Sequence, residues 1–117
     1  MAVRLVISGC CGRMGQAIAR CAIADSVFSL GAVLEAAGHE AAGKDYGLIL
    51  GRPITPAVTV ATDAKAAMGQ GDVVIEFTSP DATAAHVQLA QELRKPIVIG
   101  TTGLSEPQLL ALRNAAR

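Results

Sequence analysis

The chain has 117 residues, of which 51% are hydrophobic, although it contains no Trp, one Tyr and two Phe. Such a chain can form one domain with a core of Val, Ile, Leu and Ala, a composition typical of parallel strands covered by alanine-rich helices. Ten acidic and ten basic residues balance, so the sequence offers no basic field for nucleic acid. No apolar run approaches the ~20 residues that span a bilayer, and we expect no secretory signal. We therefore expect a cytoplasmic protein without nucleic-acid or membrane partners.

The first expected strand covers residues 3–8 and ends in a cluster of regularly spaced glycines. The cluster has the spacing G-x-x-G-x-x-G and consists of Gly9, Gly12 and Gly15. Apolar residues at helical spacing follow, which predicts a helix over residues 13–24 that begins inside the cluster. In such a strand–turn–helix the glycines let the main chain approach a nucleotide pyrophosphate, and the free amides of the first helical turn face the anion. A glycine-rich turn without a ligand is the alternative, because Cys11 replaces the second glycine of the usual G-x-G fingerprint.

The second expected strand covers residues 28–34 and ends on Glu35, twenty residues after Gly15. At this distance an acidic side chain accepts hydrogen bonds from the hydroxyls of an adenosine ribose; a merely solvated carboxylate is the alternative. A ribose 2′-phosphate would be repelled, and Ala36 supplies no balancing cation. We therefore expect NADH to bind at least as tightly as NADPH. Arg13 is the nearest basic candidate for that phosphate or for the pyrophosphate.

The segment 36–55 is rich in Gly and Ala and is longer than an ordinary connection. We expect one short helix near residues 45–50 and interpret the rest as a flexible flap or a family-specific insertion. The next expected elements are a strand at 58–61, a short helix capped by Thr62 or Asp63 and running to Met68, and a strand at 72–77. The last are a helix opened by Ser79-Pro80 and running to Leu93, a strand at 97–99, and a helix opened by a capping box of Ser105 and Gln108.

Five strands alternating with helices predict an α/β fold, a Rossmann-like doubly wound parallel sheet of strand order 3-2-1-4-5. In such sheets a ligand lies beyond the carboxyl ends of the strands, near the point where the strand order reverses. Four expected strands end in a glycine or polar cluster, at residues 9–15, Glu35, residues 78–80 and residues 100–103. Their convergence on one edge predicts one ligand site more strongly than any single motif does.

No catalytic constellation is evident in the sequence. The two histidines, His39 and His86, are expected at the surface. The carboxylates interpreted as helix caps or strand-edge residues are Asp63, Asp72, Glu76 and Asp81. The only tyrosine, Tyr46, is followed four residues later by Leu50, so the Tyr-x-x-x-Lys dyad of short-chain dehydrogenases is missing.

Three cysteines form an odd set without metal-ligand spacing, in keeping with a reducing cytoplasm. We expect Cys21 in the core, on the inner face of the first helix. Cys10 and Cys11 are interpreted as small side chains that fill the glycine turn. A thiolate favoured by the helix N-terminus is the alternative for this pair.

The glycine turn and three further segments resemble the bacterial dihydrodipicolinate reductases, also called 4-hydroxy-tetrahydrodipicolinate reductases, of lysine and diaminopimelate biosynthesis. The sequence G-C-C-G-R-M-G of residues 9–15 resembles the family's G-x-x-G-R-M-G nucleotide turn. Leu34-Glu35 is similar to the family's ribose-binding acid. The sequence E-F-T-S-P at residues 76–80 is similar to its D-F-T-x-P segment, and G-T-T-G at residues 100–103 matches its G-T-T-G segment. The resemblance runs through essentially the whole chain.

The resemblance implies NADH or NADPH as cofactor and hydride transfer from the nicotinamide to a cyclic imine dicarboxylate. The residues it implies for cofactor binding are Gly9, Cys10, Cys11, Gly12, Arg13, Met14, Glu35, Phe77, Thr78, Gly100, Thr101 and Thr102. Of these, residues 100–102 would hold the nicotinamide end. Catalytic and metal-binding residues are expected to be absent from this chain.

Members of the family continue into a substrate and tetramerisation domain with a histidine-rich motif. Residues 1–117 are therefore expected to be a dinucleotide-binding domain that binds cofactor without catalysing. The chain departs from the family pattern at Glu76 for Asp, at Cys10-Cys11 for smaller residues, and at Ala36 where some members carry a basic residue. One alternative is a stand-alone NAD-binding regulatory module. A methyltransferase is a further alternative, disfavoured because it has no use for G-T-T-G after the fifth strand.

Overall fold

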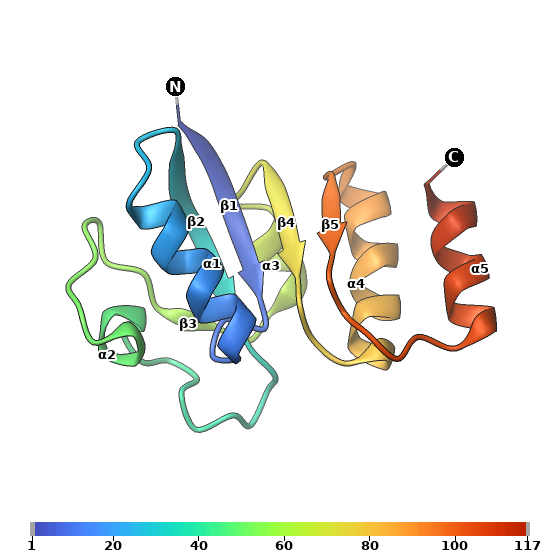
Figure 1. Ribbon diagram of the computed structural model, residues 1–117, viewed down its shortest axis with the longest axis horizontal. Coiled ribbons are helices and arrows are strands. Elements are labelled where there is room, and N and C mark those ends of the chain that lie inside the picture. Colours follow the sequence, from blue (N-terminus) through green and yellow to red (C-terminus); the bar gives the residue numbers. More distant parts are fainter. Residues whose placement is uncertain (1, 117) are drawn as a thin grey trace.

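The computed structural model describes residues 2–116; Met1 and Arg117, the ends of the expected domain, lie outside the described residues. Its centre is a five-stranded parallel sheet (Figure 1). The strands are β1 (Val3–Ser8), β2 (Phe28–Leu34), β3 (Val60–Ala61), β4 (Val73–Glu76) and β5 (Ile97–Ile99). The helices are α1 (Arg13–Ile23), α2 (Tyr46–Leu50), α3 (Ala64–Met68), α4 (Pro80–Leu93) and α5 (Glu106–Ala115).

The strand order β3-β2-β1-β4-β5 confirms the predicted Rossmann-like topology. β1 lies in the middle and pairs with both β2 and β4, so that Ser8 at its end faces Leu34 of β2 and Glu76 of β4. Glu76 in turn faces Ile99 at the end of β5. The register therefore aligns the last residues of four strands, and the segments that follow them leave the same edge of the sheet.

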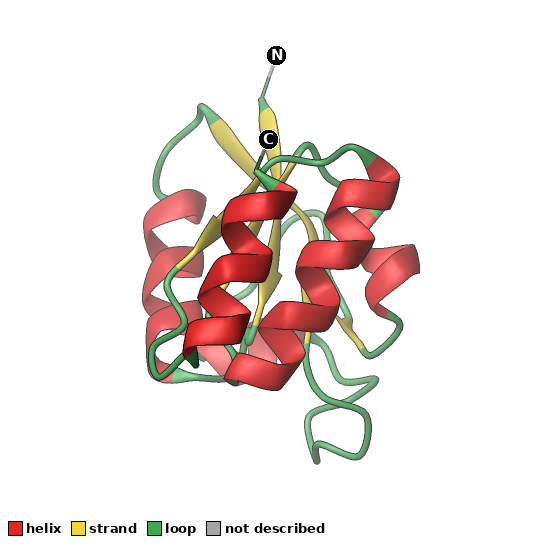
Figure 2. Cartoon of the chain, turned by 90° about the vertical axis from the view of Figure 1, so that its right-hand side faces the viewer, coloured by secondary structure: helices red, strands yellow, loops and turns green. Residues whose placement is uncertain are grey.

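Helices cover both faces of the sheet, and β1 contributes to both cores because successive side chains of a strand point to opposite faces. Leu5 and Ile7 belong to a cluster with residues of α1 and α2. Val6 belongs to a second cluster with residues of α3 and α4. α5 packs against α4 and lies beside it (Figure 2). The apolar run of β1 is thus buried on both faces, as its composition predicts.

The long segment between β2 and β3 is tied to the core in its second half. The short helix α2 forms where it was predicted, with Asp45 as its N-cap. Tyr46 is fully buried, and its hydroxyl donates to the carbonyl of Cys10 at 2.7 Å. Arg20 of α1 donates to the carbonyl of Leu50, also at 2.7 Å. These contacts fix α2 against α1 and the glycine turn.

Two strands are shorter than the sequence predicts. β3 covers only Val60–Ala61, because Thr59 forms an isolated antiparallel bridge with Asp45 instead of continuing the parallel ladder. β4 lacks one residue at each end of the predicted range. The other strand boundaries agree with the prediction.

The predicted helix caps are confirmed by side-chain hydrogen bonds. Ser79 accepts from the amide of the third residue of α4, and Asp63 does the same for α3. Ser105 and Gln108 form the predicted capping box of α5. Each cap satisfies amides that a helix leaves without partners at its start.

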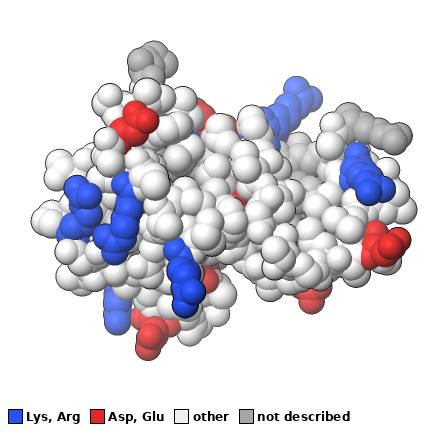
Figure 3. All heavy atoms as spheres, in the orientation of Figure 1, with Lys and Arg blue, Asp and Glu red and all other residues white. Residues whose placement is uncertain are grey.

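The surface carries mixed charge. On the face shown in Figure 3, Lys and Arg side chains are interspersed with Asp and Glu side chains and separated by wide neutral areas. Within residues 2–116, no helix has the length and apolar character needed to cross a membrane.

Gly15→Ala should destabilise the fold even though alanine favours helices over glycine by about 1 kcal/mol. A Cβ at this position would overlap the carbonyl oxygen of Gly9, so α1 could no longer lie against the turn. We expect the free energy of unfolding, measured by urea denaturation, to fall by roughly 1–3 kcal/mol. Gly12→Ala is the control, because a Cβ there meets only the Gly9 oxygen, at 3.4 Å. Equal stability of the two variants would contradict the packing role of Gly15.

Candidate functional site

A cleft of about 410 Å³ opens at the carboxyl edge of the sheet, where the strand order reverses. Its walls come from the segments that follow β1, β2 and β4 and from the first turns of α4. Ligands of doubly wound sheets bind at this position. The predicted site residues that line the cleft are Gly9, Gly12, Glu35, Phe77 and Thr78.

The three glycines of the turn have different roles. Gly9 has a left-handed backbone (φ 83°), and a Cβ there would overlap the carbonyl oxygen of Phe77. Gly15 permits the close approach of α1 to Gly9, as described above. Gly12 has almost no neighbour within 4 Å of its missing Cβ. The main chain at Gly12 is therefore open to a ligand that comes from the cleft.

α1 begins directly at this turn, and the amides of its first turn are free. Its N-cap, Gly12, has no side chain with which to cap them. Within the described part of the chain, no acceptor is hydrogen-bonded to the amides of Arg13, Met14 and Gly15. These amides carry the positive end of the helix dipole. This corner of the cleft therefore favours an anion such as pyrophosphate. Arg13 is the first residue of α1, and its side chain is exposed.

Glu35 stands at the end of β2, next to the turn. Its Oε2 accepts a hydrogen bond from the amide of Cys11 at 3.1 Å, and its Oε1 accepts one from the amide of Ala36 at 3.1 Å. These two bonds orient the carboxylate but use only part of its capacity, since two ionised oxygens offer about four acceptor positions. The half-buried carboxylate therefore lines the cleft with lone pairs available for hydroxyl donors.

Cys10 and Cys11 are adjacent in the turn but differ in environment. Cys10 is fully buried in the core, as predicted for a small side chain that fills the turn. Its amide donates to the carbonyl of Leu34, and its carbonyl accepts from Tyr46. Cys11 is half-buried, with its Sγ 3.8 Å from that of Cys10. Burial raises the pKa of both thiols, which argues against the alternative of a free thiolate in the turn.

The prediction that Cys21 lies in the core is wrong. Cys21 is exposed, because the buried face of α1 is formed by Gly15, Ala19 and Ala22. Successive residues of a helix are rotated by about 100°, so the neighbour of buried Ala22 points away from the sheet.

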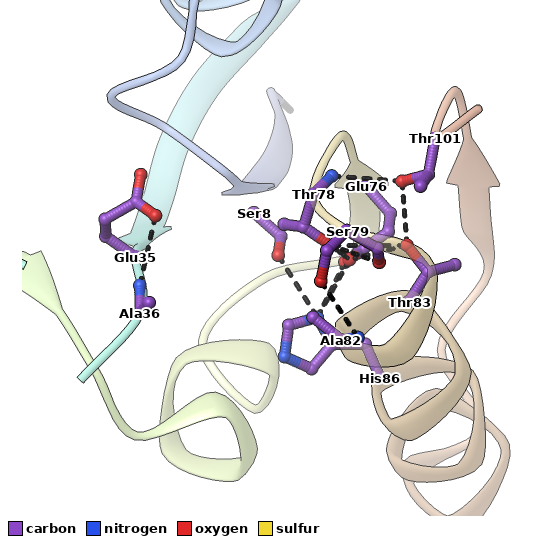
Figure 4. Close-up of polar contacts among 10 residues, drawn as sticks. All are labelled: Ser8, Glu35, Ala36, Glu76, Thr78, Ser79, Ala82, Thr83, His86 and Thr101. Carbon is purple, nitrogen blue, oxygen red and sulfur yellow. Dashed lines mark hydrogen bonds and ion pairs between the residues drawn. The ribbon is translucent and has the colours of Figure 1, made fainter. Parts of the chain in front are cut away.

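Glu76 and His86 form a polar network at the cleft, in contrast to their predicted roles as a strand-edge and a surface residue (Figure 4). Glu76 is fully buried, and Nδ1 of His86, itself mostly buried, lies 2.9 Å from its carboxylate. The hydroxyl of Thr78 also donates to Glu76, and Oγ1 of Thr83 lies 3.3 Å from Oε2 of the same carboxylate. Both predictions were wrong because α4 folds back over the end of β4 and covers the carboxylate. Ser8 completes the network, with its Oγ 3.3 Å from the same ring nitrogen.

The pKa of Glu76 results from opposing effects. Burial raises it, but hydrogen bonds from His86 and Thr78 lower it more, so that the pKa of this carboxyl lies below its ordinary value of 4.5. The carboxylate is therefore ionised at neutral pH, and its buried charge is stabilised by the donors around it.

Thr101 joins the end of β5 to the start of α4. Its hydroxyl oxygen accepts hydrogen bonds from the amide of Thr78 at 3.0 Å and from the hydroxyl of Thr83 at 2.7 Å. The ring of Phe77 packs against the main chain at Gly100, where a Cβ would overlap it. The segments after β4 and β5 thus form one connected unit, and Figure 4 shows it across the cleft from Glu35.

Not every predicted cofactor residue lines the cleft. Those outside its wall are Cys10, Cys11, Arg13, Met14, Gly100, Thr101 and Thr102. Cys10 lies in the core, Met14 projects into solvent and Thr102 is exposed beyond β5.

Ser8, Thr83 and His86 were not predicted as site residues. A signal for two of them exists in the sequence, because Thr83 and His86 are three positions apart and share a helical face with the cap Ser79. A polar face on a helix that follows a strand-end carboxylate indicates such a network.

The Glu76→Gln substitution should make the free energy of unfolding less dependent on pH in the acidic range. Because the folded-state pKa of Glu76 lies below the unfolded value, its stabilising contribution is complete above pH 4.5 and is lost as the pH falls through the folded pKa. At neutral pH the variant should lose roughly 1–3 kcal/mol of unfolding free energy, since a charged hydrogen bond is removed. Between about pH 6 and pH 3 its urea-denaturation midpoint should then change less than that of the wild type. Glu92→Gln, on the exposed face of α4, is the matched control; parallel pH curves for Glu76→Gln and wild type would refute this account.

Comparison with known proteins places the chain in one family. The family model described as "Dihydrodipicolinate reductase, N-terminus" matches residues 3–117. Two proteins named 4-hydroxy-tetrahydrodipicolinate reductase are similar: that of Ralstonia pickettii is 42% identical over 106 residues, and that of Bradyrhizobium sp. is 44% identical over 104 residues. The matches cover 91% and 88% of this chain but 40% and 38% of those proteins. The chain thus spans about two fifths of the length of these relatives.

Solved structures agree with the fold. The dipicolinate-bound dihydrodipicolinate reductase of Paenisporosarcina sp. TG-14 matches with a TM-score of 0.76 and 25% identity, over 99% of this chain and 43% of that one. Aspartate semialdehyde dehydrogenase II of Vibrio cholerae matches with a TM-score of 0.70 and 16% identity, over 87% of this chain and 31% of that one, and shares the fold alone.

The predicted resemblance is therefore confirmed. In this family the N-terminal domain is the one that binds NADH or NADPH, and the relatives are oxidoreductases. The chain belongs to the dihydrodipicolinate reductase family, to whose N-terminal domain it corresponds.

Proposed function

We propose that this chain binds NADH or NADPH in the cleft as the cofactor-binding domain of a 4-hydroxy-tetrahydrodipicolinate reductase. The observation that carries the proposal is the alignment of four strand ends on one edge. It brings the free amides of α1, the carboxylate of Glu35 and the Phe77–Thr78 segment around a single cleft. The amides bind an anion, the carboxylate accepts hydroxyl donors, and the Phe77–Thr78 segment forms a wall of backbone and aromatic groups. A dinucleotide site requires these three features.

Each part of the cofactor has a matching group in the chain. The open main chain at Gly12 and the amides that follow it suit the pyrophosphate, and Arg13 adds a positive charge there. Glu35 suits the adenosine ribose, because its free lone pairs accept hydroxyl donors. Thr78 and Thr101 lie across the cleft from Glu35 (Figure 4), and together with Phe77, which lines the cleft, they suit the nicotinamide end. The remaining predicted contacts, at Gly9, Cys11, Met14, Gly100 and Thr102, belong to the same proposal. Cys10 is not among them, because it is fully buried and its amide and carbonyl are bonded to Leu34 and Tyr46.

The bound cofactor would supply a hydride to a cyclic imine dicarboxylate in lysine and diaminopimelate biosynthesis. The residues of this chain would bind and orient the cofactor. We place the substrate-binding residues and the proton donor in a second domain outside these 117 residues. We further propose that the full-length enzyme is a homotetramer, that it is located in the cytoplasm and that it has no nucleic-acid partner.

Calorimetry tests the binding function directly. NADH should bind to the isolated chain with one site per molecule, and the chain should not oxidise NADH when the imine substrate is added. Absence of NADH and NADPH binding by the folded chain would refute the proposed function. Turnover by the 117 residues would refute the placement of substrate-binding groups in another domain.

Ala36→Arg should shift the cofactor preference toward NADPH. In the wild type, a 2′-phosphate would lose one hydrogen bond to Glu35 and bring two like charges together, and salt screens part of this repulsion. We expect NADH to bind at least as tightly as NADPH, and the guanidinium at position 36 to raise NADPH affinity several-fold by paired hydrogen bonds to the phosphate. Ala36→Met is the control for side-chain size. A tenfold wild-type preference for NADPH would show that Glu35 does not hold the ribose.

A further inference from the structure

Two adjacent cysteines and the acid at the end of β2 converge beside the glycine turn. The Sγ atoms of Cys10 and Cys11 lie 3.8 Å apart. With one carboxylate oxygen of Glu35 they form a set of three ligand atoms that all lie within 4.8 Å of one another. Spacing in the sequence does not reveal this set, because Glu35 is 24 residues from Cys11 and is brought to it by the parallel pairing of β1 and β2.

The separation of the two sulfur atoms fits a shared metal ion. Two thiolates bound tetrahedrally to zinc, with Zn–S bonds of about 2.3 Å, lie about 3.8 Å apart. A disulfide would require the sulfur atoms of Cys10 and Cys11 to approach to about 2.0 Å. A thiolate sulfur and a carboxylate oxygen on one tetrahedral zinc lie about 3.5 Å apart. The carboxylate oxygen of Glu35 lies within 4.8 Å of both sulfur atoms, so it needs to come closer by about 1.3 Å or less to complete a three-ligand set.

The surroundings hold these ligands in place. The amide of Cys11 donates to Oε2 of Glu35 at 3.1 Å, so the carboxylate already leans toward the turn. The backbone of Cys10 is held by its hydrogen bonds with Leu34 and Tyr46. Such outer contacts orient metal ligands. Cys11 and Glu35 are half-buried, whereas Cys10 is fully buried, so a cation would approach from the side of Cys11 and Glu35.

We propose that Cys10, Cys11 and Glu35 form a binding site for a thiophilic divalent cation of the zinc class. Binding displaces the two thiol protons and leaves both sulfur atoms as thiolates on the metal. Because Glu35 then coordinates the cation, it is withdrawn from the ribose position. Cation and dinucleotide therefore exclude one another, a consequence that rests on the proposed function of Glu35.

Titration of the reduced 117-residue chain with Cd²⁺ tests the site without any activity assay. We expect one ion per chain and an ultraviolet sulfur-to-cadmium charge-transfer band, with Zn²⁺ competing for the same site. Cys11→Ser should weaken Cd²⁺ binding at least tenfold and diminish the band, and Glu35→Gln should weaken binding while keeping the band. Cys21→Ser removes the exposed cysteine of α1 and should bind as the wild type does. Wild-type affinity in Cys11→Ser, or loss of binding in Cys21→Ser, would overturn the site.

Competition with NADH tests the mutual exclusion of cation and dinucleotide separately from the metal site itself. Saturating NADH should raise the apparent dissociation constant for Cd²⁺ in the wild type. Unchanged Cd²⁺ affinity in the presence of bound NADH would overturn the mutual exclusion. Cd²⁺ binding by a folded chain that binds no dinucleotide would instead support the metal site and count against the proposed function.

Discussion

Parallel pairing of β1 with both β2 and β4 is the constraint on which the site depends. The pairing sets Ser8 opposite Leu34 and Glu76, and the residues after each strand consequently meet at one edge. A slip of one residue would turn the side chains of a strand to the opposite face of the sheet. The β1–β2 register shifts by one residue between Leu5, which faces Leu30, and Val6, which faces Ala32. Beyond this irregularity Val6 and Ile7 stay in the two apolar cores. The position of Glu35 beside the turn is therefore a product of core packing.

Buried charge on the opposite side of the cleft gives that wall its rigidity. An ionised carboxylate in the interior is costly unless donors surround it. Glu76 meets this condition through His86, Thr78 and Thr83, and within the described residues every buried side-chain nitrogen or oxygen has a hydrogen-bond partner. Since Thr83 and Thr78 also bond to Thr101, the same network fixes the end of β5 relative to α4. The two walls are thus held by different forces, apolar packing at β2 and hydrogen bonding at β4.

Sequence reasoning predicted the features that depend on local chemistry. The strand order, the caps at Ser79 and Ser105, and the different demands on Gly9 and Gly15 follow from apolar runs, capping preferences and backbone sterics. Sequence reasoning failed for residues whose burial depends on which helix packs against which strand. Glu76 and His86 look exposed in isolation and are covered only because α4 packs across the end of β4. The convergence of Cys10, Cys11 and Glu35 likewise requires the paired strands, and the outward direction of Cys21 depends on the packing angle of α1.

In the proposed binding mode the pyrophosphate lies against the open main chain at Gly12, and the NADH affinity of a Gly12→Val variant reports on this contact. The new Cβ would have only the Gly9 oxygen within 4 Å, and the branches beyond it would occupy the approach of the ligand. We expect the variant to remain folded and its NADH dissociation constant to be at least tenfold higher, about 1.4 kcal/mol of lost binding free energy. Unchanged NADH affinity in the folded variant would show that the pyrophosphate does not lie against Gly12.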